Sequence, residues 1–337
     1  MHSSPSARRW LGLALAVIIA WPSLARAQGL RLPNHDGSIK FAVFGDTGTR
    51  STAQYEVARQ MVAYHQVFKF DFVLMCGDNL YGGSSPKDYK TRFEQPYAEL
   101  LAAKVKFYAT LGNHDSPIQI NFKDWNMGGQ RYYTWQETAG GFAKMGGTGV
   151  RFFALDSNYM DKTQLDWLES ELKQSSSEWK IAFFHHPLYS SGRTHGSSVD
   201  LRALLEPLFT SYGVRVVFSG HDHFYERIKP QNGIQYFVCG AGGSLREHNI
   251  DRSSGLTEVG FDTDYSFLMV EIDGLDLYFQ AISRTGVTID AGILHHEPLA
   301  AAEAAPLPPP ADSTKVPTAH VSPTPPEDTV PAPVGSR

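Results

Sequence analysis

Short apolar runs rich in β-branched and aromatic residues alternate with helix-like patterns along the first two thirds of the chain. Most of these runs end at a turn of polar residues and glycine, and they predict strands at 39–44, 71–75, 106–111, 150–155, 180–184 and 214–218. Apolar residues at helical spacing between them predict helices at 52–68, 86–103, 163–174 and 200–212. This alternation predicts a largely parallel sheet with crossover helices.

The pattern changes after His223, where strands follow one another without helices between them. Further strands are predicted at 235–239, 266–272 and 275–283. Asp273-Gly274 predicts a tight hairpin between the last two. We expect these strands to close a second, more antiparallel sheet. Two regions are predicted as loops, 116–149 and 244–264.

The N-terminal segment has the composition of a secretory signal peptide. Arg8-Arg9 precede an apolar run at 11–20, and Ala25-Arg26-Ala27 follows as a small-residue cleavage site. The run is shorter than the roughly 20 residues that a membrane span needs. We therefore expect residues 1–27 to be removed and the protein to be secreted or periplasmic, with an uncleaved anchor as the alternative. The paired arginines match a twin-arginine signal only in part, so the export route stays open.

The C-terminal segment differs from the rest of the chain. Residues 298–337 hold more than half of the chain's 20 prolines and show no apolar periodicity. Such a segment cannot bury enough surface to fold, so we predict a disordered tail without assigning it a role. The predicted catalytic domain is then residues 28–297.

Charge and cysteine content exclude several classes of protein. The formal net charge is −5, with no basic block, so no nucleic-acid partner is expected. Only two cysteines are present, Cys76 and Cys239, which excludes a disulfide scaffold and a cysteine-based zinc site. Whether they are bonded stays open, although both fit buried small apolar positions. The 13 histidines lie mostly in a few short clusters.

Candidate metal ligands follow the predicted strands at the points where these end. These turns contain Asp46, Asp78, Asn113-His114, His185-His186 and His221-Asp222-His223. Because the carboxyl ends of parallel strands share one edge of a sheet, we expect these side chains to meet there. Carboxylate, amide and imidazole donors without thiolate suit Fe, Mn or Zn. Even seven of these residues as ligands would exceed the needs of one tetrahedral ion, so a two-metal site is predicted, which is typical of displacement at phosphorus.

The order of these blocks resembles the calcineurin-like metallophosphoesterases. The blocks are Gly-Asp-Thr-Gly at 45–48, Gly-Asp-Asn at 77–79, Gly-Asn-His-Asp at 112–115, His185, and Gly-His-Asp-His at 220–223. Tyr81, three positions after Asp78, is similar to the tyrosine of the purple acid phosphatases, which binds Fe(III) as a phenolate. Chain length favours the small, mammalian-type (tartrate-resistant) branch. A packing role for Tyr81 is the alternative. The resemblance implies a four-layer αββα sandwich of two mixed sheets.

The resemblance also implies a role for each residue. The two ions would be Fe(III) and a divalent Fe, Zn or Mn ion. Ligands of the first would be Asp46, Asp78, Tyr81 and His223; those of the second would be Asp78, Asn113, His185 and His221. His114 would contact phosphate and protonate the leaving group, and His195 would be a second substrate-facing residue unless it is an ordinary exposed loop histidine. His186 would lie behind the ligands, and Asp115 and Asp222 would orient their neighbours.

The function implied is an exported acid phosphatase that hydrolyses phosphate monoesters by attack of a metal-bound hydroxide. A phosphodiesterase or nucleotidase on the same scaffold is the alternative. A catalytically silent binding protein of this fold is a third possibility, but such a protein would be expected to lack a metal ligand, and none is missing here. The expected partner is a small phosphate ester, with no integral membrane span. The physiological substrate, the second metal and the oligomeric state stay open.

Overall fold

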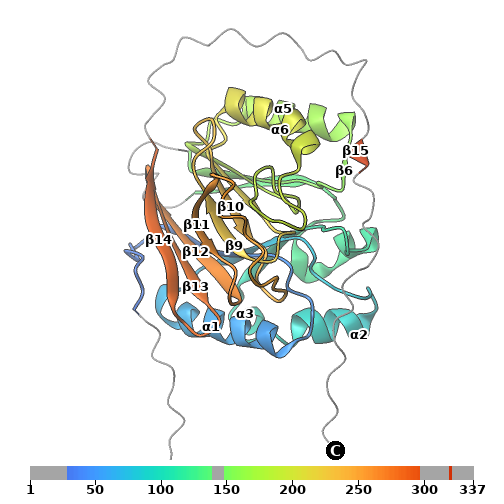
Figure 1. The fold of residues 1–337 in the computed structure, drawn as a ribbon, viewed down its shortest axis with the longest axis vertical. Coiled ribbons are helices and arrows are strands. Elements are labelled where there is room, and N and C mark those ends of the chain that lie inside the picture. Colours follow the sequence, from blue (N-terminus) through green and yellow to red (C-terminus); the bar gives the residue numbers. More distant parts are fainter. Residues whose placement is uncertain (1–28, 139–147, 297–318, 321–337) are drawn as a thin grey trace, which may run out of the picture.

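The computed structural model describes residues 29–138 and 148–296, together with the backbone of residues 319–320. Within these residues two β-sheets pack face to face, and helices cover the outer face of each sheet (Figure 1). The predicted signal segment lies outside the described residues, as does the predicted tail apart from 319–320.

The first sheet has six strands in the order β14-β13-β12-β1-β2-β3. β1, β2 and β3 are parallel, whereas β12 pairs antiparallel with β1 and continues through β13 to β14. The strands are β1 Ile39–Phe44, β2 Phe72–Cys76, β3 Lys106–Thr110, β12 Ser266–Asp273, β13 Asp276–Ser283 and β14 Thr288–His295.

The second sheet has seven strands in the order β11-β9-β10-β8-β7-β5-β4. β5, β7, β8 and β10 are parallel, and β4, β9 and β11 pair antiparallel with their neighbours. The strands are β4 Tyr133–Glu137, β5 Val150–Ala154, β7 Trp179–Phe183, β8 Val216–Ser219, β9 Tyr225–Ile228, β10 Gln235–Cys239 and β11 Thr257–Phe261. Both sheets are mixed.

Alternating residues of the central strands point to opposite faces and so build three apolar layers. In β1, Phe41 and Val43 lie in the core between the sheets, and Ala42 and Phe44 face the helices. Helices α1 Thr52–Phe68, α2 Pro86–Tyr89 and α3 Ala98–Ala102 pack on the first sheet. Helices α5 Lys162–Gln174 and α6 Val199–Tyr212 pack on the second. The predicted four-layer αββα sandwich is thereby confirmed.

Helix α1 follows the predicted boundaries because local signals and burial agree. The Ser51 side chain accepts a hydrogen bond from the backbone N–H of Gln54 and so caps the first turn. Val57, Met61 and Tyr64 recur at helical spacing and are all buried. The helix ends before Lys69, which has a left-handed backbone with φ 49°.

The predicted helix at 86–103 is wrong as a single element. The segment divides into α2, a π-helical turn at Lys90–Glu94 and α3. Pro96 stands within it and has no N–H to donate to the turn before it. The N–H of Gln95 instead reaches back five residues to the carbonyl of Lys90 (2.9 Å).

The expectation that the C-terminal strands close a separate sheet is also wrong. β12 and β13 extend the first sheet beyond β1, and β10 lies in the second sheet parallel to β8. A mainly apolar run such as 266–272 does not specify which edge it joins, and the free edge of β1 takes β12 in register from Ile39 with Ile272. The segments predicted as loops contain β4 and β11. β11 has a register shift between Thr257 and Val259, which weakens its alternation.

The backbone of two residues of the predicted tail belongs to the described fold. Ala319–His320 forms β15, which pairs antiparallel with β6 (Tyr159–Met160), as Figure 1 shows at the edge of the molecule beside α5. Across the described residues, no helix has both the length and the apolar content that a membrane span requires.

Candidate metal centre

The predicted ligands meet at one edge of the sandwich, where parallel strands of both sheets end. Asp46 follows β1, Asp78 follows β2 and Asn113 follows β3, while His185 follows β7 and His221 follows β8. The loops are joined by their backbones: the N–H of Asp46 donates to the carbonyl of Gly77 (2.9 Å), and the N–H of His221 donates to Asp46 Oδ2 (2.9 Å). The two sheets therefore contribute jointly to one site.

Three of the predicted ligands have left-handed backbones. The φ angles are 57° at Asp46, 50° at Asp78 and 70° at His221. Residues other than glycine adopt this conformation rarely, although aspartate and histidine tolerate it better than most. Strained backbone of this kind is concentrated at functional sites, where the surrounding structure holds it in place.

Two glycines leave the space that the carboxylates occupy. A Cβ atom at Gly112 would overlap the carboxylate of Asp78, and one at Gly220 would lie 2.5 Å from Asp46 Oδ2. The glycines in the Gly-Asn-His-Asp and Gly-His-Asp-His blocks are therefore required for close approach.

The carboxylates and Tyr81 form one side of the site. Ligand atoms of Asp46, Asp78 and His185 lie within 4.8 Å of one another, and all three residues are buried. The Tyr81 hydroxyl lies 3.3 Å from Asp46 Oδ1 and 3.3 Å from His223 Nε2, while Asp46 Oδ1 and His223 Nε2 are also 3.3 Å apart. These atoms converge on one point, as the predicted first set of ligands requires.

Asn113 and two imidazoles form the other side. His185 Nε2 lies 2.9 Å from Asn113 Oδ1, 3.1 Å from His221 Nδ1 and 3.5 Å from Asp78 Oδ1. The carboxylate of Asp78 therefore stands between this group and the group around Tyr81.

The donor set fits a cation. His185 Nδ1 lies 2.9 Å from the carbonyl oxygen of Cys76, which can only accept, so we assign the proton of the neutral ring to Nδ1. The lone pair on Nε2 then faces the oxygen atoms of Asn113 and Asp78, which are themselves acceptors. A cation among these atoms satisfies all of them, and the oxygen and nitrogen donors suit a first-row metal.

The pKa shifts of the buried site residues also support a bound cation. Burial raises the pKa of Asp46 well above its usual range, and Asp78 adds to this while His185 opposes it. Burial also acts to raise the pKa of Asp78, but the attraction of the neighbouring imidazoles when protonated, His185 foremost, and the hydrogen bond from the His114 N–H outweigh it, so that pKa is lowered. Burial lowers the pKa of His221 well below its ordinary value and raises that of the Tyr81 phenol. A bound cation would displace the proton from Asp46 and from Tyr81, whereas Asp78 and His221 already favour the proton-free forms that bind metal.

A model of the calcineurin-like phosphoesterase family matches residues 39–225. The chain belongs to this family. Tartrate-resistant acid phosphatase type 5 of Homo sapiens is 27% identical over 320 residues, covering 80% of this chain and 96% of that protein. Purple acid phosphatase 17 of Arabidopsis thaliana is 29% identical over 252 residues, covering 64% of this chain and 72% of that protein. The predicted resemblance is confirmed, and the chain is a metal-dependent hydrolase.

Solved structures agree on the fold. A purple acid phosphatase from seeds of yellow lupin (Lupinus luteus) matches with a TM-score of 0.61 at 18% identity, covering 78% of this chain and 55% of that one. A dimetal phosphatase from Danio rerio matches with a TM-score of 0.56 at 15% identity, covering 78% of this chain and 100% of that one. At these identities the likeness concerns the fold alone.

Within this phosphoesterase fold, His114 lies at the mouth of the site. Its backbone N–H donates to Asp78 Oδ1 (2.9 Å), which ties it to the carboxylate group. Its side chain is 35% exposed, with Nε2 4.0 Å from Asp78 Oδ2 and its ring 4.9 Å from that of Tyr81. The imidazole is therefore open to solvent on one side and close to the ligands on the other.

His195 also lies at the site, with its ring 4.1 Å from that of His221. The buried carboxylate of Asp222 holds the loop that carries His195. Asp222 Oδ2 accepts hydrogen bonds from the hydroxyl of Ser190 (2.5 Å) and the N–H of Gly196 (3.1 Å). The ring of His195 is therefore half-buried beside a predicted ligand, and its contact with substrate stays a prediction.

Asp115 fixes the loops around Asp78. Its carboxylate accepts hydrogen bonds from the N–H groups of Gly112 (2.9 Å), Asn79 (3.0 Å) and Leu80 (3.0 Å). Asp115 and Asp222 thus orient backbone, as the sequence predicts. Cys76 and Cys239 are buried, free thiols.

The resemblance implies that His186 lies behind the ligands, and the structure brings its ring closer to them. Its ring lies 4.4 Å from that of His221, and ligand atoms of His185, His186 and His221 lie within 4.8 Å of one another. Burial lowers the pKa of His186 to about 3. The Asp156-Ser157-Asn158 turn after β5, to which the sequence assigned no role, supplies its partner Ser157.

The glycine-rich turn at 240–243 also supports the site, a role that the sequence pattern did not predict. The N–H of Gly242 donates to the carbonyl of Gly45 (3.1 Å), and a Cβ at Gly243 would overlap the backbone of Thr47. This turn therefore packs on the loop that carries Asp46. Its signal in the sequence is the run of small residues itself.

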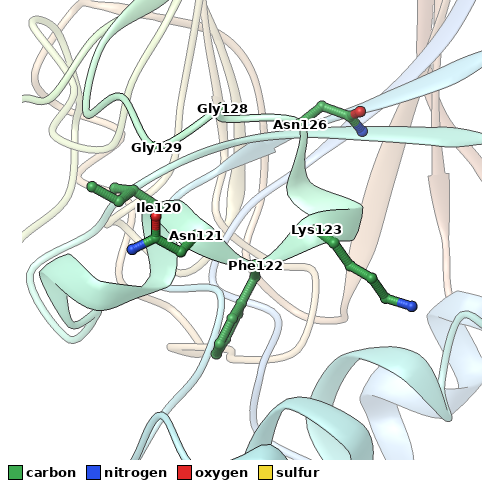
Figure 2. A pocket seen from close by; sticks show the side chains of 7 residues that line it. All are labelled: Ile120, Asn121, Phe122, Lys123, Asn126, Gly128 and Gly129. Carbon is green, nitrogen blue, oxygen red and sulfur yellow. The ribbon is translucent and has the colours of Figure 1, made fainter.

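An open hollow of about 500 Å³ lies in the insertion that follows β3 (Figure 2). Its lining includes Ile120 and Asn121 from the 3₁₀ turn Pro117–Asn121 and Lys123 from the turn Lys123–Trp125, all labelled in Figure 2. None of the predicted site residues lines this hollow.

Proposed function

We propose that the protein is an exported purple-type acid phosphatase that hydrolyses phosphate monoesters at a binuclear metal centre. The observation that carries the proposal is the division of the donor atoms into two groups on either side of Asp78. One group surrounds the Tyr81 hydroxyl, 3.3 Å from both Asp46 and His223. The other surrounds His185 Nε2, with Asn113 and His221.

Asp46, Asp78, Tyr81 and His223 would hold the first ion, which the phenol of Tyr81 suits to be Fe(III). Asp78, Asn113, His185 and His221 would hold the second, divalent ion. When bound, the ions supply Lewis acidity that neutralises phosphate charge and activates water. The names of two relatives, tartrate-resistant acid phosphatase type 5 and purple acid phosphatase 17, support the proposed acid phosphatase activity.

The chain's own residues position the substrate and move the proton. His114 is the exposed group beside Asp78, so its imidazolium donates a proton to the oxygen that leaves the phosphorus. His195, fixed beside His221, binds a phosphate oxygen from the opposite side. Asp222 and Asp115 hold these groups in position through backbone hydrogen bonds.

A comparison of two substrates tests the reaction. The purified enzyme should hydrolyse p-nitrophenyl phosphate, a monoester, at least tenfold more efficiently than bis(p-nitrophenyl) phosphate, a diester. We expect the monoester reaction to be faster at acidic than at neutral pH. A preference for the diester would favour the phosphodiesterase alternative on the same scaffold.

Export rests on Arg8-Arg9, the apolar run that follows and Ala25-Arg26-Ala27. The mature protein should begin at Gln28 and be recovered from the periplasm or the medium. N-terminal sequencing of the active protein tests this, and retention of residues 1–27 in a cytoplasmic form would contradict it.

A further inference from the structure

His186 has one ring nitrogen in use and one without a partner. Its side chain is buried, with 1% of its surface exposed. Nδ1 lies 2.9 Å from the hydroxyl of Ser157, whereas Nε2 has no hydrogen-bond partner among the described residues. A buried polar atom without a hydrogen-bond partner destabilises the fold unless another group, such as a bound ion, interacts with it.

The ring of His186 belongs to a cluster of three imidazoles. Ligand atoms of His185, His186 and His221 lie within 4.8 Å of one another, a group distinct from the carboxylate group of Asp46, Asp78 and His185. The ring of His186 is 4.4 Å from that of His221 and 5.0 Å from that of His185. His185 is the member that the two groups share.

His186 repeats the arrangement seen at His185. In His185, Nδ1 is tied to the carbonyl oxygen of Cys76 (2.9 Å), which leaves Nε2 toward the site. In His186, the Ser157 hydroxyl oxygen already accepts from the backbone N–H of His186 (3.1 Å) and can accept from Nδ1–H as well. Metal-bound histidines characteristically donate their second ring nitrogen to an oxygen in this way.

We propose that His186 Nε2 is a further nitrogen donor to the second metal position, which makes that position a three-imidazole site selective for Zn²⁺. The proposal rests on the proposed binuclear centre and adds a ligand to it. Together with Asp78 and Asn113 the position would then have five protein donors, three of them imidazoles, and imidazole suits Zn²⁺ whereas Mn²⁺ prefers oxygen donors. Sequence reasoning assigned His186 no contact with metal, so the proposal separates this chain from the pattern that the resemblance implies.

The first measurement needs no variant. Apoprotein loaded with two equivalents of Co²⁺ gives one strongly shifted, solvent-exchangeable ¹H NMR signal for each bound imidazole that retains an N–H. His185, His186, His221 and His223 should give four signals. Three signals would overturn the proposal while leaving the binuclear centre intact, and a protein that binds fewer than two ions would instead contradict the proposed function.

The second measurement is a zinc titration against a chromophoric chelator. His186→Asn removes Nε2 but keeps an amide near Ser157, and it should weaken the second zinc by more than about 100-fold, beyond the loss that an outer partner causes. Ser157→Ala keeps His186 Nε2 and should weaken binding of the second zinc by about 100-fold at most.

His295→Asn is the control, because its side chain is 67% exposed and pairs with Asp276, and neither residue belongs to the ligand groups. It should leave zinc affinity within about threefold of wild type. Zinc affinity in His186→Asn within the same limit would show that His186 faces the substrate or only packs.

Discussion

Asp78→Asn tests the shared carboxylate, because this residue borders both groups of donors. The amide retains an oxygen that can accept the N–H of His114, which lies 2.9 Å from Asp78 Oδ1. The metal-free variant should therefore fold, with a free energy of unfolding within about 1–2 kcal/mol of wild type. What the variant loses is a charged donor to each ion.

The size of the effect follows from linkage. At a free metal concentration 100 times Kd, each ion adds about 2.7 kcal/mol to the free energy of unfolding. Two ions add about 5 kcal/mol, which raises Tm by roughly 10–20 °C in a domain of this size. If each site of the variant binds 100-fold more weakly, the same concentration adds only about 0.4 kcal/mol per ion. The metal-induced rise should then nearly disappear.

Thermal unfolding of chelator-treated protein, with and without added metal, measures this difference. Turnover of p-nitrophenyl phosphate should fall by about 10³-fold or more, because the ions supply several kcal/mol of transition-state stabilisation. Asp166→Asn is the control: its side chain is 62% exposed and pairs with Lys162 on the surface, so stability should change by less than about 1 kcal/mol. Activity of Asp78→Asn within tenfold of wild type, or an unchanged metal-induced rise in Tm, would refute the shared-ligand reasoning.

Three further substitutions separate the roles of neighbouring residues. His114→Asn should lower kcat by about 10²–10⁴-fold for alkyl phosphates, and by less for p-nitrophenyl phosphate, whose leaving group needs little protonation; equal losses on both would argue against a proton donor. Gly112→Ala places a Cβ against the Asp78 carboxylate and should reduce metal content and activity together, whereas Gly29→Ala, in open space, should change neither. Asp115→Ala leaves three backbone N–H groups without their acceptor and should lower the free energy of unfolding by at least about 3 kcal/mol in urea titrations; a loss below 1 kcal/mol would contradict its role in holding the loops.

Much of the site could be predicted from sequence because its ligands are adjacent to strands with strong local signals. β1 spans Ile39–Phe44 as predicted, and the chain turns directly into Asp46. Parallel pairing of β1 with β2 and β3 then brings Asp78 and Asn113 to the same edge. Short connections between strand and ligand leave little freedom for the ligands to lie elsewhere.

Long-range pairing could not be read in the same way. The apolar residues of β12 fit either sheet, and only the free edge of β1 decides between them. The position of His186 depends on Ser157, which lies 29 residues away and reaches it across the parallel pairing of β5 with β7. His186 directly follows the predicted ligand His185, and this position gives no indication that its ring turns toward His221.

Tyr81 provides the most direct test of the central claim. Its hydroxyl lies 3.3 Å from both Asp46 Oδ1 and His223 Nε2, so a bound Fe(III) would receive a phenolate and absorb visible light by charge transfer. The oxidised wild-type protein, with iron measured, should be pink to purple with a broad band in the middle of the visible range. Tyr81→Phe keeps the ring but removes the donor oxygen, so it should be folded and colourless. A wild-type protein that holds a full equivalent of iron and yet has no visible band would contradict the account and leave Tyr81 as a packing residue of a metallophosphoesterase of another kind.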